Sequence, residues 1–351
     1  MPSLPVSLKH IRRMTDDTGI AEHALGIIPR RKEGYSTDDQ ARALWACLAW
    51  LDVAEGDEKE ELHRLIDTYL SFMLWVQRED GHFHNNIAFD RTPEDETPSD
   101  DCLGRCIWAS ALTLTTLQDE DRKLAAKQML EKALPLAEEM AFPRGRAYAL
   151  AAVSLLLRSG CPFDFDLREA AERWADRLIG SYRTHARPET GWHWYEPALT
   201  YSNGVLPWGL LSAYEATGRP ELLDVAEQSL RFLIRLSADE EGRIRPVGNR
   251  GWCTPGHRAM WDQQPIDVMK LMLAVSKAYE ITRDKDYADV AKRCRNWFHG
   301  DNDAGMPIAD VKEGAACDGL EENGLNRNKG AEATIAYLLT ESLYHSLVGT
   351  T

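Results

Sequence analysis

Two places in the chain carry paired aspartates directly after a hydroxyl residue. Asp38 and Asp39 follow a Ser-Thr dipeptide, and Asp100 and Asp101 follow a serine. Each pair begins a segment that we expect to be helical, where Ser, Thr and Asp commonly cap the first turn. A cap needs only one such side chain, so each helix start has a carboxylate to spare. We expect at least one Asp of each pair to face a cleft, with Asp39 and Asp101 as candidate catalytic bases.

A third segment gathers aromatic and polar residues in the string WHWYEPALTYSNGVLP, residues 192–207. Aromatic faces stack on the C–H faces of sugar rings, and carboxylates and amides bind hydroxyls, so the mixture suits a carbohydrate cleft. Glu196 stands among aromatic residues, which would keep a carboxyl protonated, and is therefore the candidate general acid. The alternative is that the tryptophans alternate into the core of a hairpin. The expected ligand contacts are Trp192, His193, Trp194, Tyr195, Tyr201 and Asn203.

Two further segments also lead into apolar runs. In residues 249–267, Asp262 is either a helix cap or a catalytic acid or base, and Pro265 suits the first helical turn, where its missing N–H does no harm. In residues 326–333, Glu332 is either the capping-box partner of Asn328 or a cleft carboxylate. The remaining expected substrate contacts at these helix starts are Tyr35, Asp38, Asp100, Arg105, Trp252, His257, Trp261, Gln263, Asn328 and Glu332.

All of these residues precede or begin short, almost wholly apolar segments. The six segments are residues 36–51, 99–114, 144–158, 201–215, 262–280 and 328–344. Between them lie charged segments with apolar residues at helical spacing, at 58–78, 120–141, 166–185, 219–237 and 284–299, with a shorter one near 5–14. Helices that are apolar all round must be buried on all sides, and these runs are too short to span a membrane.

The alternation of buried and half-buried helices predicts an all-α fold, an (α/α)6 toroid of six helical hairpins. The repeat is also visible as AYEAT at 213–217 and AYEIT at 278–282. Glu-x-Gly turns followed by alternating residues predict short β-hairpins in the loops between helices. No linker or low-complexity tract divides the chain, so we expect residues 1–351 to form a single domain. The closed ring would bring six loop-to-helix junctions to one face.

Composition restricts the class of ligand. With 41 basic and 56 acidic residues, the net charge is −15, which argues against binding to nucleic acid or to an anionic membrane. The first 20 residues have no apolar signal-peptide core, and seven cysteines are an odd number, so we expect reduced thiols and a cytoplasmic protein. Cys102 and Cys106 are expected to be small core residues. No metal-binding or nucleotide-binding motif occurs, and we expect neither a metal ion nor a cofactor.

These segments carry a resemblance to known proteins. The chain resembles the (α/α)6-toroid carbohydrate-active proteins, which include glycoside hydrolases, unsaturated-uronyl hydrolases and acylglucosamine epimerase-like isomerases. More narrowly, a bacterial family of uncertain activity is similar in GYSTDDQARAL (34–44), in WHWYEPALTYSNGVLP (192–207) and in LNRNKGAEATIAYLL (325–339). Members of that family often carry Asp before the Asn of the Tyr-x-Asn sequence. This chain has Ser202 there, so the resemblance implies no catalytic role for that position.

Three functions are compatible with these residues. The first is hydrolysis of a neutral oligosaccharide by two carboxyls, with Glu196 as acid and Asp39, Asp101 or Asp262 as base. Inversion is expected because separate helices hold carboxylates far apart. The second is sugar epimerisation or isomerisation by His193 and His257, which would have to converge within about the width of one sugar. The third is a non-catalytic carbohydrate-binding module. The oligomeric state is left open.

Overall fold

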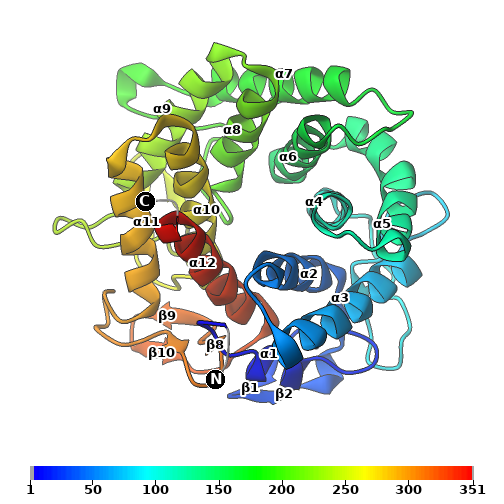
Figure 1. Cartoon of the computed structure of the whole chain (residues 1–351). Coiled ribbons are helices and arrows are strands. Elements are labelled where there is room, and N and C mark those ends of the chain that lie inside the picture. Colours follow the sequence, from blue (N-terminus) through cyan, green and yellow to red (C-terminus); the bar gives the residue numbers. More distant parts are fainter. Residues whose placement is uncertain (1–3, 350–351) are drawn as a thin grey trace.

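The computed structural model describes residues 4–349; residues 1–3 and 350–351, the two ends of the expected domain, lie outside the described residues. Its helices form two concentric layers around a common axis (Figure 1). Short antiparallel strand pairs occupy the loops. The predicted (α/α)6 toroid is therefore confirmed. Within residues 4–349, every helix is too short or too polar to cross a bilayer.

The inner layer is a closed ring of six helices. Each inner helix contacts the next, and the last contacts the first. Almost every residue in the first three turns of these helices is buried, as the apolar sequences predict. Two of the helices touch backbone to backbone, since a Cβ on Gly104 would lie 2.4 Å from the carbonyl oxygen of Gly145. The inner helices are α2 (Thr37–Leu51), α4 (Asp100–Thr116), α6 (Pro143–Ser159), α8 (Val205–Thr217), α10 (Pro265–Thr282) and α12 (Ala331–Gly349).

The outer layer consists of amphipathic helices, which bury one face against the inner ring. In the second outer helix the buried face includes Leu62, Ile66 and Tyr69, at the helical spacing seen in the sequence. The outer helices are α1 (Lys9–Met14), α3 (Gly56–Val76), α5 (Glu120–Ala133), α7 (Leu167–His185), α9 (Pro220–Leu236) and α11 (Lys285–Phe298). Each hairpin of the ring therefore pairs one fully buried helix with one half-buried helix.

Several helix boundaries differ from the prediction; α12, for example, begins at Ala331 rather than at residue 328 and runs to Gly349 rather than to residue 344. The first outer helix begins only at Lys9, after a non-helical segment. The run expected at 120–141 ends as an α-helix at Ala133 and continues as the 3₁₀ helix η2 (Leu134–Glu139), because Pro135 cannot donate the next helical hydrogen bond. The run expected from residue 201 begins at Val205, because Ser202 has a left-handed backbone with φ +50°.

Short strand pairs decorate the loops at the ring's faces, all of them antiparallel. They are β1 (Ala24–Leu25) with β2 (Ile28–Pro29), β3 (Tyr35–Ser36) with β4 (Asn86–Ile87), β5 (Cys253–Thr254) with β6 (His257–Arg258), β7 (Ala309–Asp310) with β8 (Ala315–Ala316), and β9 (Gly319–Glu321) with β10 (Gly324–Asn326). Two further 3₁₀ turns are η1 (Arg31–Glu33) and η3 (Pro188–Thr190). The predicted Glu-x-Gly turns are present, each closed by a single bridge: Gln77 with Phe83, Arg187 with Trp192, and Ala238 with Ile244.

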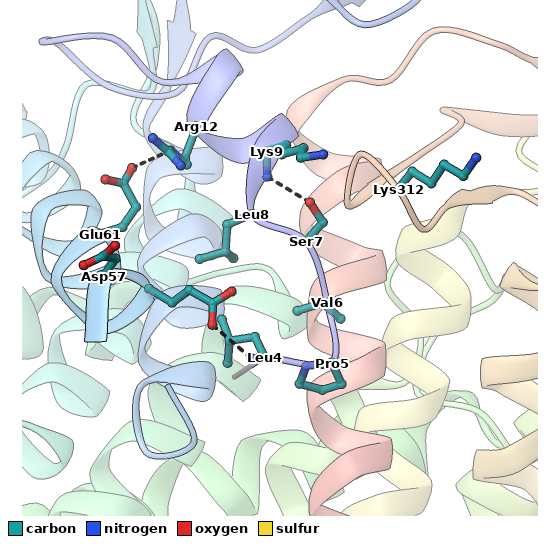
Figure 2. Close-up of a pocket in the computed structure, with 11 residues that line it drawn as sticks. Leu4, Pro5, Val6, Ser7, Leu8, Lys9, Arg12, Asp57, Glu61 and Lys312 are labelled. Atoms are coloured by element: carbon teal, nitrogen blue, oxygen red, sulfur yellow. Dashed lines mark hydrogen bonds and ion pairs between the residues drawn. The ribbon is translucent and has the colours of Figure 1, made fainter. Parts of the chain in front are cut away.

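A groove of about 460 Å³ lies outside the ring, beside α1, which is the shortest of the outer helices. The non-helical segment Leu4–Leu8 forms one wall, and Arg12 of α1 reaches Glu61 of α3 at 3.1 Å (Figure 2). Buried Leu4, Val6 and Leu8 complete the outer layer that the short helix leaves unfilled. None of the residues expected to bind or act on a ligand lines this groove.

Candidate functional site

Serines cap both helices that begin with paired aspartates. The Ser36 hydroxyl accepts the N–H of Asp39 at the start of α2, and the Ser99 hydroxyl accepts the N–H of Cys102 at the start of α4. The aspartates are therefore released from capping their own helices, as expected. Asp100 nevertheless serves the fold, because its carboxylate accepts the backbone N–H groups of Ala141 and Phe142 just before α6.

The start of α2 contains a buried group of charges. Asp39 forms an ion pair with Arg42 at 2.8 Å, and the other end of the same guanidinium lies 3.0 Å from Glu332 of α12. Asp38 pairs instead with Arg105 of α4, also at 2.8 Å. Glu332 is thus a cleft carboxylate rather than the capping-box partner of Asn328, whose side chain accepts the N–H of Gly26.

The two neighbouring aspartates differ in their affinity for protons. Burial raises the pKa of Asp39 to about 7, opposed by Arg42 and reinforced by the nearby Glu332 carboxylate. Burial acts on Asp38 as well, but the guanidinium groups of Arg105 and Arg42 outweigh it and hold the pKa of Asp38 below its usual value. Near neutral pH, one carboxyl therefore carries a proton for much of the time while its neighbour is ionised.

A cavity of about 300 Å³ opens beside these residues, where the first turns of α2, α10 and α12 meet. Its acidic lining is unusually dense, and burial raises the pKa of Glu22 and of Asp318 in the same way as that of Asp39. The residues that line it are Glu22, His23, Ser36, Asp38, Asp39, Arg42, Asn85, Asn86, Gln264, Pro265, Asp318, Gly330, Glu332 and Ala333. Among residues 4–349, no three acidic, His or Cys side chains are grouped so that they could hold a metal ion.

A chain of polar contacts extends from this cavity across the ring. Arg105, which pairs with Asp38, also lies 3.4 Å from the carboxylate of Asp101. Asp101 in turn accepts a hydrogen bond from the hydroxyl of Tyr201. The Tyr201 ring lies 4.6 Å from the guanidinium of Arg144, the first charged residue of α6.

Arg144 continues the chain to the last predicted carboxylate. It contacts both carboxylate oxygens of Glu196, at 3.0 and 2.9 Å. Only the contact to Oε1 is a hydrogen bond, and Oε2 accepts none, so Arg144 holds Glu196 with one acceptor oxygen unused. The candidate carboxylates Asp38, Asp39, Asp101, Glu196 and Glu332 thus belong to one network that crosses the mouth of the ring.

Below this network, aromatic rings fill the axis. Trp45, Trp108, Tyr148 and Trp208 come from four consecutive inner helices, and their ring centroids lie 4.7–6.2 Å apart. Lys270 of α10 is wholly buried among them, 4.8 Å from the Trp45 ring, and its amine has no hydrogen-bond partner. Burial, with Arg42 and Arg105 nearby, lowers the pKa of Lys270 well below its usual range.

Asp267, one turn before Lys270, is a second buried titratable group of α10. One carboxylate oxygen accepts the backbone N–H of Ser202 at 2.6 Å, and the other has no partner. Burial raises the pKa of Asp267 to about 7, although the Ser202 N–H opposes the shift. A buried carboxyl group with a pKa shifted toward neutrality and one unpartnered oxygen is a candidate functional residue.

The aromatic string that precedes α8 lies mostly in the core, which corrects the expected ligand contacts there. Trp194 and Tyr195 have no exposed surface, and the Tyr195 hydroxyl bonds to Ser229 of α9. Trp192 is also buried, and its indole N–H donates to the carbonyl of Glu196. The hairpin alternative of the sequence analysis describes the two tryptophans, and Tyr195 is buried beside them. Tyr201 alone of the string's aromatic residues is exposed, at 37%.

The two histidines of the isomerase hypothesis have different surroundings. His193 lies 3.2 Å from the hydroxyl of Tyr182 in α7 and packs edge-on against Phe232 of α9, so it faces the outer layer. His257 is exposed on the β5–β6 hairpin. Neither of them lines the cavity, where the histidine is His23, 3.6 Å from Glu22.

Most of the remaining predicted residues hold loops in place. Tyr35 donates its hydroxyl to Asp16, Asn203 closes a turn through Thr200, and Asp262 pairs with Arg250 at 3.0 Å. The fully buried Gln263 bonds to Asp303 and Trp297. Pro265 begins α10, as predicted. Trp252 and Trp261 are half-buried, and Trp252 lies 6.5 Å from the Tyr201 ring.

Arg42, Arg144, Asp267 and Lys270 were missed by the sequence analysis. One signal marks the last of them, since a lysine in the apolar run of α10 needs an explanation. No comparable signal marks Arg144, because its helix start has no paired acids. All seven cysteines are free thiols, and Cys102 and Cys106 are buried in the core, as predicted.

Comparison with known proteins supports the fold. No family model matches the chain, and no curated protein sequence matches it. Among solved structures, cellobiose 2-epimerase from Bacillus thermoamylovorans superposes with a TM-score of 0.73 at 13% identity, covering 98% of this chain and 96% of its own. A D-mannose isomerase gives 0.72 at 13% identity, with 97% of both chains covered. A family 76 α-mannanase from Bacteroides thetaiotaomicron gives 0.67 at 11% identity, covering 97% and 94%. At these identities the likeness establishes the toroid, which is shared by hydrolases, epimerases and isomerases of sugars.

Proposed function

We propose that this protein is a glycoside hydrolase that acts on a neutral oligosaccharide at the mouth of the ring. The observation that carries the proposal is the opposite shift in pKa of Asp38 and Asp39 beside one cavity. Hydrolysis of a glycosidic bond needs one protonated carboxyl and one ionised carboxylate. Environments that push two pKa values apart supply that combination at neutral pH.

In this proposal Asp39 is the general acid. Its raised pKa fits the role, whereas Glu196 is held by Arg144 with one carboxylate oxygen unused, which favours a part for Glu196 in binding sugar hydroxyls. The general base is Asp38, whose pKa is held below its usual value, or Asp101, and Arg105 contacts both. This base would activate water for inversion of the anomeric carbon. The exposed ring of Tyr201 offers a stacking surface for a second sugar. We also propose that the chain is one domain in the cytoplasm, consistent with the closed inner ring and the free thiols.

The test is product analysis by NMR on a panel of neutral oligosaccharides and free monosaccharides. Wild type should release shorter sugars, and Asp39→Asn should reduce the rate by a factor of about 10²–10⁴. The matched control, Glu61→Gln on the outer helix α3, should leave the rate unchanged. The anomer formed first distinguishes inversion from retention. Binding without turnover by the wild type would contradict the proposal and indicate a carbohydrate-binding module.

Sugar epimerisation or isomerisation is the second candidate, because two of the solved structures with this fold carry out such reactions over nearly the same length of chain. In this chain His193 faces the outer helices and His257 lies on an exposed hairpin, so a proton-abstracting base would have to be found elsewhere. Two side chains of a suitable chemical type are the candidates for this base: Lys270, buried beside Trp45, and His23, which lines the cavity. Interconversion of a free monosaccharide without cleavage, in the same NMR assay, would favour this function over hydrolysis.

A further inference from the structure

The loop that carries Tyr201 connects several parts of the polar network. In residues 200–204, here called the Tyr201 loop, the Thr200 hydroxyl and the Tyr201 carbonyl both accept hydrogen bonds from Arg144, at 2.7 and 2.6 Å. The Tyr201 hydroxyl reaches Asp101. The conformation of these few residues therefore decides where an exposed aromatic ring, a catalytic candidate and the Glu196–Arg144 pair lie relative to one another.

The backbone of this loop is strained at its centre. Ser202 has φ +50°, a left-handed conformation that side chains other than Gly, Asn and Asp rarely adopt. Its hydroxyl is buried without a hydrogen-bond partner, so the side chain of Ser202 does not hold the conformation. A strained conformation persists only where the surroundings impose it.

The surrounding structure that meets the loop is the first part of α10. Asp267 accepts the N–H of Ser202 at 2.6 Å, between two buried residues, and the backbone of Asn203 also stabilises the ionised carboxylate. Two residues on, the chain lies directly on the same helix, since a Cβ on Gly204 would be 2.0 Å from the carbonyl oxygen of Lys270. The second oxygen of Asp267 is buried and has no partner. Burying a carboxyl group with one unpartnered oxygen lowers the free energy of unfolding. A residue with a purely structural role would not carry this penalty.

We propose that Asp267 is a positioning residue: its carboxylate holds Ser202 in the left-handed conformation and thereby fixes Tyr201 against Arg144 and Asp101. The hydrogen bond to an ionised carboxylate is about twice as strong as one to a neutral acceptor. Burial raises the pKa of Asp267 to about 7; Glu332 of α12 adds to the shift, and Arg144 of α6 opposes it. The loop is therefore held more firmly above pH 7 than below it. This role concerns the loop itself; only its effect on turnover rests on the proposed hydrolase activity.

Hydrogen–deuterium exchange of the whole protein tests the loop directly. Protection factors are compared for the peptide that contains residues 200–204 at pH 6 and pH 8, with intrinsic exchange rates divided out. In wild type the protection should be several-fold greater at pH 8. In Asp267→Ala it should fall at least ten-fold, and in the isosteric Asp267→Asn it should be intermediate and independent of pH. The control Glu280→Ala, at the far end of α10, should behave as wild type.

Three outcomes would overturn the proposal. Unchanged loop protection in both Asp267 variants would show that the loop does not depend on this carboxyl. Protection that follows pH equally in wild type and Asp267→Asn would assign the pH effect to another group. Loss of sugar turnover with an unchanged loop would mean that Asp267 acts on the substrate itself. If Asp267→Ala does not fold, Asp267→Asn still decides, and if wild type cleaves no glycoside, the proposed function fails while the exchange result stands.

Discussion

Asp38 of α2 and Arg105 of α4 form an ion pair 2.8 Å long between two inner helices, with only 4% of the Arg105 side chain exposed. The same guanidinium also contacts Asp101 of its own helix. One cation is thus shared by one carboxylate from each aspartate pair. Arg105 and Arg42 hold the pKa of Asp38 below its usual value, while burial raises the pKa of the neighbouring Asp39 to about 7.

The first prediction concerns the pH dependence of catalysis. A general acid must be protonated, so kcat/KM should fall as pH rises through about 7, the pKa of Asp39. The ionised partner has a pKa below its usual value if it is Asp38, so the acidic limb should lie below about pH 4. In Asp39→Asn the residual rate should lose its alkaline limb. An alkaline limb that persists near pH 7 in that variant would assign the acid role to a different group.

The second prediction concerns stability at the shared cation. Arg105→Met leaves two carboxylates without their guanidinium and should lower the free energy of unfolding by about 3–5 kcal/mol at pH 7. Arg64→Met is the control: Arg64 is half exposed in its pair with Glu61, and the loss should be about 1 kcal/mol or less. Urea denaturation of the two variants measures the difference. Equal losses would show that the buried pairs contribute no more than a surface pair.

Acid should weaken the same contact. The pKa of Asp38 is lowered in the folded protein, so its contribution to stability is present above its usual pKa of about 4 and is lost as pH falls through the lower, folded value.

The third prediction concerns the partnerless amine of Lys270. The unfolded chain binds a proton at this lysine up to about pH 10, whereas the folded chain gives it up at much lower pH, so folding stability rises with pH between the two values. Lys270→Met should remove that dependence and gain about 1–3 kcal/mol at neutral pH. The control is Lys277→Met, also on α10, which breaks ion pairs with Glu215 of α8 and Glu280 of α10 and should not stabilise the protein. Destabilisation by Lys270→Met would mean that contacts with Trp45 and Tyr148 outweigh the cost of burial.

The fourth prediction concerns the left-handed residue of the Tyr201 loop. Ser202→Gly removes both the strained side chain and a buried hydroxyl without a partner. It should therefore raise the free energy of unfolding by about 1 kcal/mol, measured as a higher midpoint of thermal unfolding. Ser212→Gly is the matched change within the helix α8, where it should cost about 1 kcal/mol. A loss of stability in Ser202→Gly would show that the conformation at residue 202 is not strained.

Much of the fold could be predicted because it depends on local patterns. Apolar all-round helices alternate with amphipathic ones, and that periodicity alone implies two layers. The start of α8 could not be placed in the same way, because the contact that bends the chain at Ser202 comes from Asp267, 65 residues further along.

The candidate site was predictable where the helix starts carry surplus acids and less so elsewhere. Asp38, Asp39 and Glu332 line the cavity, since a serine already caps α2. The aromatic string was interpreted incorrectly because large rings close to polar residues suit a sugar site and a packed hairpin equally. Only the packing of residues such as Trp194 against α9 distinguishes them from Tyr201. Arg144 could not be predicted from the sequence, because its role depends on contacts with residues more than 50 positions away, Glu196 and Thr200 among them.

The seam of the ring has a consequence for timing. The cavity takes Arg42 from the first inner helix and Glu332 from the last, and their 3.0 Å contact exists only when α12 has docked against α2. On a ribosome the opening helix is made long before its closing neighbour, so we expect the pocket to be among the last features to mature. A sugar that binds in the cavity would contact both α2 and α12 and should therefore slow unfolding. The unfolding rate can be measured by stopped-flow fluorescence of the tryptophans.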